Sequence, residues 1–352
     1  GFVVALSAGI LYPLYQKNGQ AARILFFSLI ACYSVLTYAR NLVWKTPETL
    51  WSDVIKKAPS VRAFNNRGAY YYQQSEHEKA AADYSRSIEL IKEKFALARA
   101  YNSRGVCFHK NNENEKARAD YLKALELDPD YEESLLNFAK LQRTEGQLIP
   151  AIESMTRVIS LNDRNADAYI TRGDLYFKSG AYANALEDAE KAITLSPTIL
   201  QGYLNKAAAL IALGRHEESL NASARALDLN PGNAEIWFSR GNAYRLSNRL
   251  DSAIIAYGRA IERDSAVSIY YNNRGIAKAQ KGDLPAAVTD FSQALTRAPN
   301  DLSARMNRSG CYLRLQDWEK ARADIDRVIS VNPNYPGAQQ NKAYLLSKTG
   351  GK

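Results

Sequence analysis

Apolar and polar residues follow a helical period through most of this chain. In residues 166–199, apolar or small side chains recur every three or four positions over two stretches, Ala166–Ser179 and Tyr182–Leu195. Gly180 lies between the stretches and can adopt the left-handed conformation that ends a helix, and Pro197 lacks the N–H that a continuing helix needs. The segment is therefore predicted to form two antiparallel helices. Such a pair cannot bury its own apolar face, so it needs similar neighbours.

The same pair of predicted helices returns along the chain at a fixed interval. From residue 98 onward the interval is 34 residues. Three markers recur in register: a small residue in the first helix, a small residue that opens the second helix, and a proline that closes it. Three extra residues near Lys92–Phe95 lengthen one junction. The predicted repeats begin at Val61, Ala98, Glu132, Ala166, Leu200, Ala234, Ser268, Leu302 and Pro336.

This period and the order of small residues and proline resemble the tetratricopeptide repeat, as Gly173, Ala185, Ala192 and Pro197 illustrate. The resemblance extends from residue 61 to about residue 348. It implies an all-α fold, a right-handed superhelical solenoid of eight repeats over residues 61–335. A capping helix is expected over residues 336–348, followed by a tail over residues 349–352.

Residues 1–40 differ from the repeats because they contain two apolar segments without a charge, Gly1–Gln16 and Ile24–Ala39. Arg23 and Arg40 flank the second segment and can extend toward the headgroups. We expect a transmembrane helical hairpin, with Tyr15–Ala22 as its turn. A buried hairpin of a water-soluble fold is the alternative. A signal peptide fits less well, because no basic region precedes the first apolar segment.

Residues 41–60 are predicted to form a linker and one amphipathic helix. Thr46 suits the N-cap, with Pro47 at the first helical position and Ala58-Pro59 at the end. This helix would be the second half of an incomplete repeat and would cover the first whole one.

The motifs at this junction add a second resemblance. Two apolar segments are followed by Arg-Asn-x-x-Trp, Thr-x-Glu-Thr-Leu-Trp, Pro and Asn-Asn-Arg-Gly. This order resembles polytopic membrane proteins with C-terminal tetratricopeptide repeats, including the transmembrane and tetratricopeptide repeat-containing O-mannosyltransferases and bacterial relatives. The resemblance implies a parent protein whose catalytic membrane half is absent here, with the repeats on the extracytoplasmic side, in the periplasm or lumen. The basic residues around the hairpin favour the cytoplasmic side instead.

One position of the repeat always carries a small hydrogen-bonding side chain. In family members that bind extended peptides, asparagines at this position line the inner surface, so the resemblance implies a peptide-binding groove. The alternative is that these side chains connect neighbouring helices. The residues are Asn66, Ser103, Asn137, Thr171, Asn205, Ser239, Asn273, Asn307 and Asn341.

Apolar side chains are expected on the same inner face of the middle repeats, with basic residues such as His109 and Lys110 at its margins. Such a groove would suit a partly hydrophobic polypeptide segment with acidic residues. Packing between repeats is the alternative role for the apolar set. These residues are Ile170, Phe177, Leu204, Ile211 and Phe238.

An arginine directly after the groove position accompanies an aspartate sixteen residues later in five repeats. Where Phe138 or Lys206 replaces the arginine, the aspartate is also missing, whereas Arg240 has no matching aspartate. We predict a structural ion pair between the two helices of each of these repeats. The pairs are Arg67 with Asp83, Arg104 with Asp120, Arg172 with Asp188, Arg274 with Asp290, and Arg308 with Asp324.

Composition narrows the function further. The formal net charge of +9 is dispersed without basic runs, so nucleic acid is not an expected partner. His77, His109 and His216 fall in three different repeats without metal-ligand spacing, and no phosphate-binding loop or catalytic constellation is present. No cofactor is expected. Two functions remain: a membrane-tethered protein-interaction domain that captures an extended polypeptide, or the substrate-presenting domain of a membrane glycosyltransferase.

Overall fold

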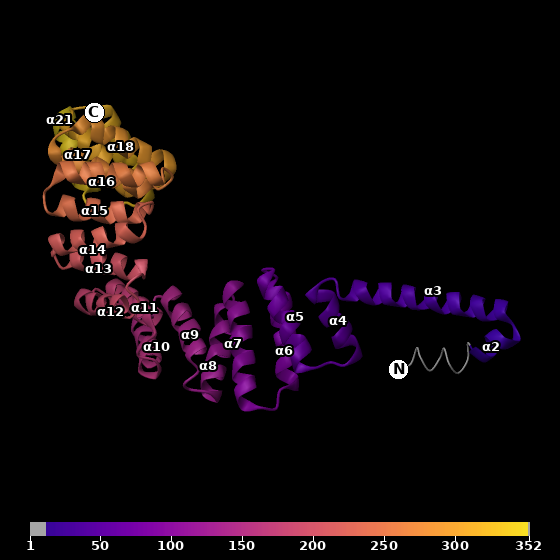
Figure 1. Ribbon diagram of the computed structural model, residues 1–352. Coiled ribbons are helices and arrows are strands. Elements are labelled where there is room, and N and C mark those ends of the chain that lie inside the picture. The colour runs from indigo at the N-terminus through magenta and orange to yellow at the C-terminus, as the bar shows by residue number, and fades with distance from the viewer. Residues whose placement is uncertain (1–11, 351–352) are drawn as a thin grey trace. The chain divides into compact units, whose positions relative to one another are not determined.

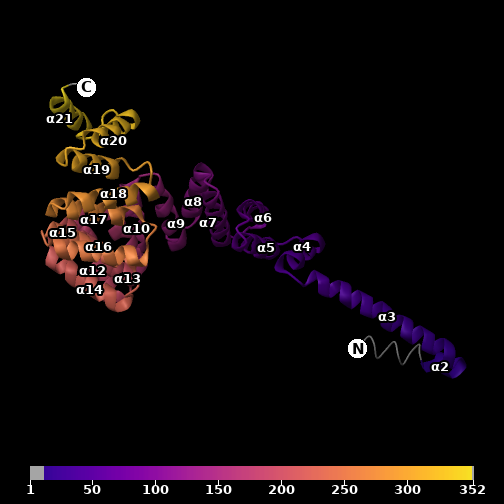
Figure 2. The same ribbon diagram turned by 90° about the horizontal axis from the view of Figure 1, so that it is seen from above.

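Twenty α-helices and no strand make up residues 12–350, the part of the chain that the computed structural model describes (Figure 1). Figure 2 shows the same helices after a turn of 90° about the horizontal axis. The chain divides into two units, residues 1–145 and 146–352, and each is described by itself. The predicted all-α repeat solenoid is confirmed.

Unit 1 contains the N-terminal helices, two whole repeats and the first helix of a third. Its helices are α2 (Tyr12–Lys17), α3 (Gly19–Val43), α4 (Pro47–Lys57), α5 (Val61–Gln73), α6 (His77–Leu90), α7 (Lys94–Lys110), α8 (Asn114–Leu127) and α9 (Glu132–Thr144). Consecutive helices from α4 to α9 pack against each other.

Unit 2 begins with the second helix of the third repeat and continues to the capping helix. Its helices are α10 (Leu148–Leu161), α11 (Ala166–Lys178), α12 (Tyr182–Leu195), α13 (Leu200–Ala212), α14 (His216–Leu229), α15 (Ala234–Leu246), α16 (Leu250–Arg263), α17 (Ser268–Lys281), α18 (Leu284–Arg297), α19 (Leu302–Arg314), α20 (Trp318–Val331) and α21 (Ala338–Thr349). The capping helix α21 starts two residues later than predicted and buries Leu345 against Ile325.

The turn between the two helices of every repeat contains one residue with a left-handed backbone. Glycine occupies this position in four repeats and Ser75, Asn112, Asn248 or Gln316 in the others. A residue with a side chain is strained in this conformation. The four repeats without glycine therefore keep the same sharp turn at some cost in conformational energy. The four glycines are Gly146, Gly180, Gly214 and Gly282.

In four repeats a glycine of the first helix faces an aromatic ring of the second helix. A Cβ atom placed on Gly241 would lie 2.5 Å from the ring of Tyr257, and one on Gly275 would lie 2.8 Å from the ring of Phe291. Gly68 and Gly105 face Tyr84 and Tyr121 in the same way. Repeats with a smaller second-helix residue tolerate a larger partner, since Ala139, Ala207 and Ser309 stand opposite Met155, Ser223 and Ile325. The glycine therefore makes room for the ring.

The extra residues before the second repeat lengthen its first helix. Helix α7 begins at Lys94 rather than at the predicted Ala98, and Glu93 caps it. The Glu93 carboxylate accepts hydrogen bonds from the backbone N–H groups of Phe95 and Ala96 at 2.8 and 2.6 Å. An acidic N-cap also interacts favourably with the helix dipole, which explains why these residues extend the helix instead of forming a loop.

The N-terminal region agrees only partly with the prediction. Its expected turn, Tyr15–Ala22, is almost entirely helical, and the break is confined to Asn18, whose side chain caps α3. Most of the first predicted membrane segment lies in residues 1–11, outside the described residues, so the structure does not show a hairpin. Helix α3 runs three residues beyond Arg40, the predicted end of the hairpin.

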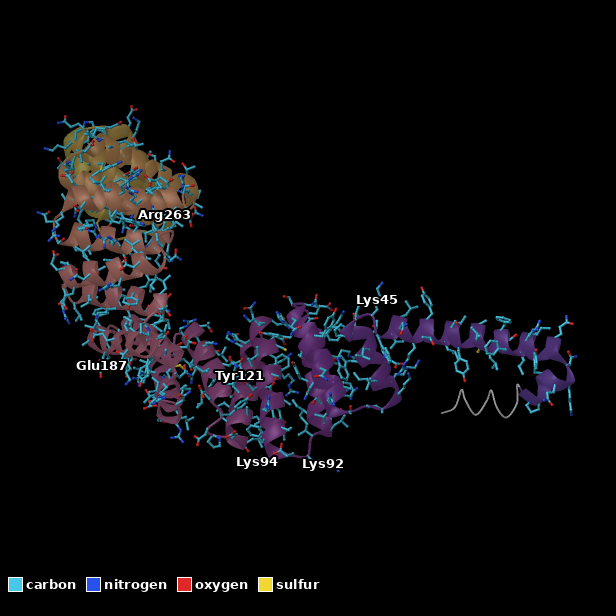
Figure 3. The ribbon with its side chains drawn as sticks, viewed as in Figure 1. Lys45, Lys92, Lys94, Tyr121, Glu187 and Arg263 are labelled. Carbon is cyan, nitrogen blue, oxygen red and sulfur yellow. The ribbon has the colours of Figure 1, made fainter. Side chains whose placement is uncertain are left out.

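Helix α3 is the one helix among residues 12–350 that is long and apolar enough to cross a membrane. Side chains project from α3 along its length (Figure 3). Most of them are exposed, including Phe27 at 65% and Val35 at 66%, and Ala22 is its one buried residue. The described residues therefore do not bury α3 in a core.

Helix α4 covers the first whole repeat. Thr46 and Thr49 form a reciprocal capping box at its start, and Pro47 occupies the first turn. Tyr71 of α5 donates a hydrogen bond to the Glu48 carboxylate at 3.0 Å, and the Arg67 guanidinium donates to the Ser52 hydroxyl at 2.9 Å. The half-repeat helix thus continues the stacking of the repeats.

Candidate functional site

The first helices of unit 1 open onto two adjoining cavities of about 450 and 290 Å³. Both are lined by Tyr72 of α5, Val106 of α7 and Asn137 of α9. We call this feature the unit 1 groove. Since three successive first helices contribute lining side chains, the groove runs across the repeats instead of along one helix.

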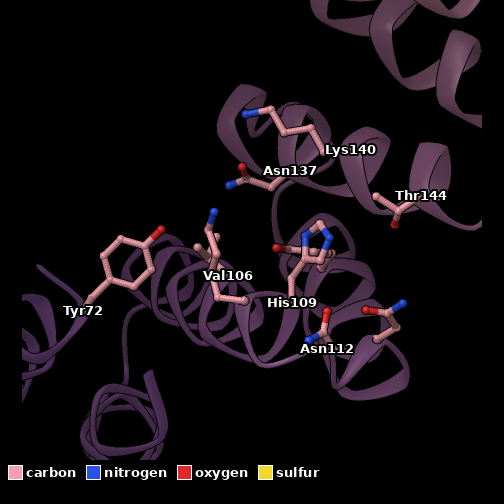
Figure 4. A pocket seen from close by; sticks show the side chains of 10 residues that line it. Tyr72, Val106, His109, Asn112, Asn137, Lys140 and Thr144 are labelled. Atoms are coloured by element: carbon pink, nitrogen blue, oxygen red, sulfur yellow. The ribbon is translucent and has the colours of Figure 1, made fainter. Parts of the chain in front are cut away.

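Polar side chains from α7, α9 and the turn after α7 surround the larger cavity (Figure 4). Val106 and Tyr72 supply its apolar wall, whereas His109, Lys140 and Asn137 bring hydrogen-bonding groups. The cavity therefore suits a ligand with both polar and apolar parts.

The amides predicted to line a groove connect neighbouring first helices in four repeats. Asn137 Nδ2 donates to Asn102 Oδ1 at 3.1 Å, and Asn307 Nδ2 donates to Asn272 Oδ1 at the same distance. Asn273 Nδ2 donates to Asn242 Oδ1 at 3.0 Å, and Asn205 Nδ2 to the carbonyl oxygen of Ile170 at 3.3 Å. The alternative structural role, a connection between helices, is thus present at these positions.

The other members of the set behave differently. Thr171 donates to the carbonyl oxygen of Asp167 in its own helix at 2.8 Å. Within the described part of the chain, the side chains of Asn66, Ser103, Ser239 and Asn341 form no hydrogen bond. Of the nine residues, Ser103 and Asn137 line the cavities of the unit 1 groove.

The predicted apolar groove residues lie partly or wholly in the core. Leu204 is 7% exposed and packs with Ala226 and Ile236, so the prediction that it lines an open groove is wrong. Phe177 packs on the core of the next repeat, and the Phe238 ring lies 5.0 Å from that of Tyr270. Ile170 and Ile211 are half-buried. Burial of large apolar side chains between repeats is the stronger driving force here.

All five arginine–aspartate pairs form two hydrogen bonds each. Nε and Nη2 of Arg172 donate to the two oxygens of Asp188 at 2.8 and 2.7 Å, and the other four pairs have the same geometry. The aspartates are at most 5% exposed. The hydrogen bonds from Arg172 to Asp188 raise the pKa of this guanidinium. These groups are therefore held inside the repeat.

The same arginines also reach the preceding repeat, a contact that the sequence argument missed. Nη1 of four of the five donates to a hydroxyl on the preceding second helix: Arg67 to Ser52, Arg104 to Ser85, Arg172 to Thr156 and Arg308 to Ser292, at 2.9–3.2 Å. The sequence feature that could have predicted this contact is a serine or threonine in the second helix of the preceding repeat. Arg240, which has no matching aspartate, donates instead to the Leu220 carbonyl and the Tyr244 hydroxyl, both at 3.1 Å.

The unit 1 groove has an excess of positive charge at its larger cavity. Lys110 and Lys140 are exposed and form no ion pair with the described residues. Nearby Glu145 is held by Arg118 at 2.7 Å. Burial, and next the charge of Lys110, lower the pKa of His109, with Lys140 acting in the same direction and Glu145 opposing it. His109 is therefore poised to report any anion that enters the cavity.

Tyr121 was not selected from the sequence, yet it lines this cavity. The residue is fully buried, and its hydroxyl has no hydrogen-bond partner. Among the described residues, no group of three or more His, Cys, Asp or Glu side chains is arranged to hold a metal ion.

Comparisons with known proteins identify the repeat. Family models described as "Tetratricopeptide repeat" match residues 98–131, 166–199, 204–268 and 272–338, more than half of the chain. No curated protein matches it.

Two solved structures share the fold. A tetratricopeptide repeat protein from Parabacteroides merdae has 17% identity and a TM-score of 0.61, over 71% of this chain and 98% of its own. The anaphase-promoting complex hetero-tetramer Cut9–Hcn1 has 18% identity and a TM-score of 0.56, over 74% of this chain and 51% of its own. These similarities concern the fold alone, and neither supports the resemblance to membrane O-mannosyltransferases.

Proposed function

Because this chain belongs to the tetratricopeptide repeat family, we propose that it is a protein-interaction module whose unit 1 groove binds an extended polypeptide segment. The observation that carries the proposal is the pair of adjoining cavities that share Tyr72, Val106 and Asn137. An extended chain alternates its side chains between two sides and keeps its backbone N–H and C=O groups free. The groove offers apolar walls for side chains and amide, hydroxyl and imidazole groups for the backbone.

Peptide capture tests this proposal directly. A phage-displayed library of random peptides is panned against the full chain in lipid nanodiscs, and enriched peptides are measured by fluorescence anisotropy. In Ser103→Trp the indole fills the smaller cavity, so affinity should fall at least about tenfold. The matched control is Leu122→Trp, which places the same ring at an exposed position of α8 outside the cavities. Equal affinity of both variants would place peptide binding elsewhere.

We further propose that α3 anchors the chain in a membrane. Its 25 residues span about 37 Å, which exceeds the roughly 30 Å of a hydrocarbon core. Exposed apolar side chains surround it, and Trp44 and Lys45 stand where the helix ends, the residue types that favour a membrane interface. From the resemblance at the junction, we also propose that the repeats lie on the extracytoplasmic side.

Thiol labelling tests both statements. Cys32 lies near the middle of α3, so in proteoliposomes a charged methanethiosulfonate should not modify it until detergent is added. Lys45→Cys in a Cys32→Ser background is the matched control and should react without detergent. Rapid labelling of Cys32 in proteoliposomes would contradict the anchor. In intact cells, an impermeant reagent should label the Lys45→Cys variant only if the repeats are extracytoplasmic.

A further inference from the structure

The unpartnered hydroxyl of Tyr121 stands out when it is compared with the same position in other repeats. In α16 the corresponding Tyr257 donates to Asn242 Oδ1 at 2.7 Å, and Asn273 Nδ2 donates to the same oxygen at 3.0 Å. In α18 the corresponding residue is Phe291, which has no hydroxyl. Unit 2 thus either pairs this hydroxyl or omits it.

Tyr121 follows neither arrangement. In its repeat, Val106 occupies the position that Asn242 has in the repeat of Tyr257. An asparagine, Asn102, lies one helical turn earlier. Asn102 accepts the hydrogen bond from Asn137 and leaves Tyr121 without a partner. The same exchange occurs in the repeat of Phe291, where Asn272 accepts from Asn307. Both repeats thus use their asparagine for the neighbouring first helix. In unit 2 this arrangement goes with Phe291, which has no hydroxyl, whereas in unit 1 it goes with Tyr121, which has one.

The surroundings of this hydroxyl are specific to unit 1. Tyr121 lines the larger cavity together with Asn137, His109, Lys110 and Lys140. Asn137 has its Nδ2 committed to Asn102, whereas the two lysine ammonium groups have no acidic partner among the described residues. Tyr84, at the equivalent position one repeat earlier, lines the adjoining cavity.

We propose that the larger cavity binds an anionic oxygen group of the captured polypeptide, a side-chain carboxylate or a phosphate monoester. Tyr121 donates a hydrogen bond to this group, and the exposed Lys110 and Lys140 neutralise its charge. The inference rests on the proposed peptide-binding role, to which it adds the chemistry of one binding position.

The protonation states suit this role. Burial raises the pKa of Tyr121, so the hydroxyl keeps its proton and acts as a donor. Burial and the two lysines lower the pKa of His109 and thus favour its neutral form, with Glu145 the opposing charge. An anion bound between these groups offsets the lysine charges and raises the pKa of His109.

The first arm of the test uses the peptides enriched on the full chain. Each carries Glu, Gln, phosphoserine or Ser at its acidic position, and binding is measured by anisotropy. The anionic versions should bind at least about tenfold more tightly than their neutral counterparts. Preference for Glu identifies the group as a carboxylate, and preference for phosphoserine identifies it as a phosphate. Peptides that bind equally well in all four versions overturn the inference while the proposed function stands.

Variants assign the effect to the cavity. Tyr121→Phe should lose about tenfold in affinity for the anionic peptide and little for the neutral one. Tyr257→Phe is the matched control and should bind both peptides like the wild type. Lys110→Gln with Lys140→Gln should remove the preference, whereas Lys191→Gln, an exposed lysine of α12, should not. Retention of the preference in Tyr121→Phe and the double lysine variant would overturn the site.

The second arm is independent of any peptide. Inorganic phosphate or acetate is added to the full chain with labelled histidine, and the pH titration of each imidazole is followed by nuclear magnetic resonance. The His109 pKa should rise, and this rise should vanish in the double lysine variant, while the His216 signals of unit 2 stay unchanged. If no peptide binds, the proposed function fails, and this titration alone decides whether the cavity holds anions. An unmoved His109 overturns the inference.

Discussion

A single hydroxyl distinguishes Tyr121 and Tyr257 from Phe291 at the same position of the repeat. Tyr257→Phe should lower the free energy of unfolding by about 1 kcal/mol, because it removes a satisfied hydrogen bond to Asn242. Tyr121→Phe should leave it unchanged or raise it by up to about 1 kcal/mol, because a buried hydroxyl without a partner is destabilising. Urea denaturation of the unliganded chain measures both. An equal loss in the two variants would mean that Tyr121 has a partner.

Two glycines inside helices should respond to alanine in opposite directions. Gly310 of α19 has open space where a Cβ atom would go, so Gly310→Ala should stabilise the chain by about 0.5–1 kcal/mol through higher helix propensity. At Gly241 the same atom would lie 2.5 Å from the Tyr257 ring, so Gly241→Ala should cost about 1–3 kcal/mol. Thermal melts followed by circular dichroism compare them. A stabilised Gly241→Ala would show that the ring moves freely.

At the scale of helices, the asparagines combine two roles. From the sequence alone, replacing Asn137, Asn205 and Asn273 by alanine should weaken ligand capture and leave the melting transition nearly intact. The hydrogen bonds to the preceding first helices change this expectation, and the triple variant should lose roughly 3 kcal/mol. The control is Asn66→Ala with Asn341→Ala, whose side chains have no hydrogen bond within the described region. If the triple variant is as stable as this control, the hydrogen bonds between first helices do not contribute to the stability of the fold.

The arginine–aspartate pairs should matter more than exposed ion pairs. Asp188→Ala leaves the Arg172 guanidinium without its main partner in a mostly buried place and should cost about 3–5 kcal/mol. Glu190→Ala breaks the exposed pair with Lys206 and should cost at most about 1 kcal/mol. Chemical denaturation measures both losses. If the two variants lose similar amounts, the buried pair is not a main source of repeat stability.

Helix periodicity and turn residues predicted nearly all of the fold, because the repeat encodes each helix locally and shows it eight times. The boundaries of α11 and α12 agree with the pattern read from Ala166–Ser179 and Tyr182–Leu195 to within one residue. The extension of α7 escaped prediction because it depends on the capping carboxylate of Glu93. The arginine–aspartate pattern was visible in the sequence because both members vary together from repeat to repeat.

The groove was harder to predict than the helices. Leu204 and Asn205 are neighbours in sequence, yet one is buried and the other half-buried, and their contacts depend on how adjacent repeats stack. The sequence did not mark Tyr121 as a binding residue, because a tyrosine is ordinary at a core position of a helix. Its importance follows from Val106 on a different helix, which cannot accept the hydrogen bond that Asn242 accepts elsewhere.

At the scale of the whole molecule, the unit boundary falls between Glu145 and Gly146, inside the repeat that has Phe138 and Ser154 instead of arginine and aspartate. Repeat arrays are stabilised mainly by neighbours, so the two units should unfold separately. Each contains one buried cysteine. Burial raises the pKa of Cys107 to about 12 and also raises that of Cys311, so both thiols react only after unfolding.

The two thiols therefore report the two units. In increasing urea, a maleimide should modify Cys107 of unit 1 at a lower concentration than Cys311 of unit 2, because unit 1 contains fewer whole repeats. Mass spectrometry of proteolytic peptides measures both reactions in one sample, with Cys107→Ser as the control for assignment. Coincident labelling curves would show that the chain unfolds as one cooperative unit.

The glycine–ring pairs also constrain the order in which this sequence can change. At Gly241 an alanine meets the Tyr257 ring, whereas a smaller residue at position 257 leaves space for it. Mutation can therefore pass from Gly–Tyr to Ala–Ser, the combination present at Ala207 and Ser223, only if the ring is lost first. The opposite order passes through the Ala–Tyr combination, which should be less stable by about 1–3 kcal/mol. The order of substitutions therefore matters when copies of one repeat diverge in sequence, although both the Gly–Tyr and the Ala–Ser pairs occur in this chain.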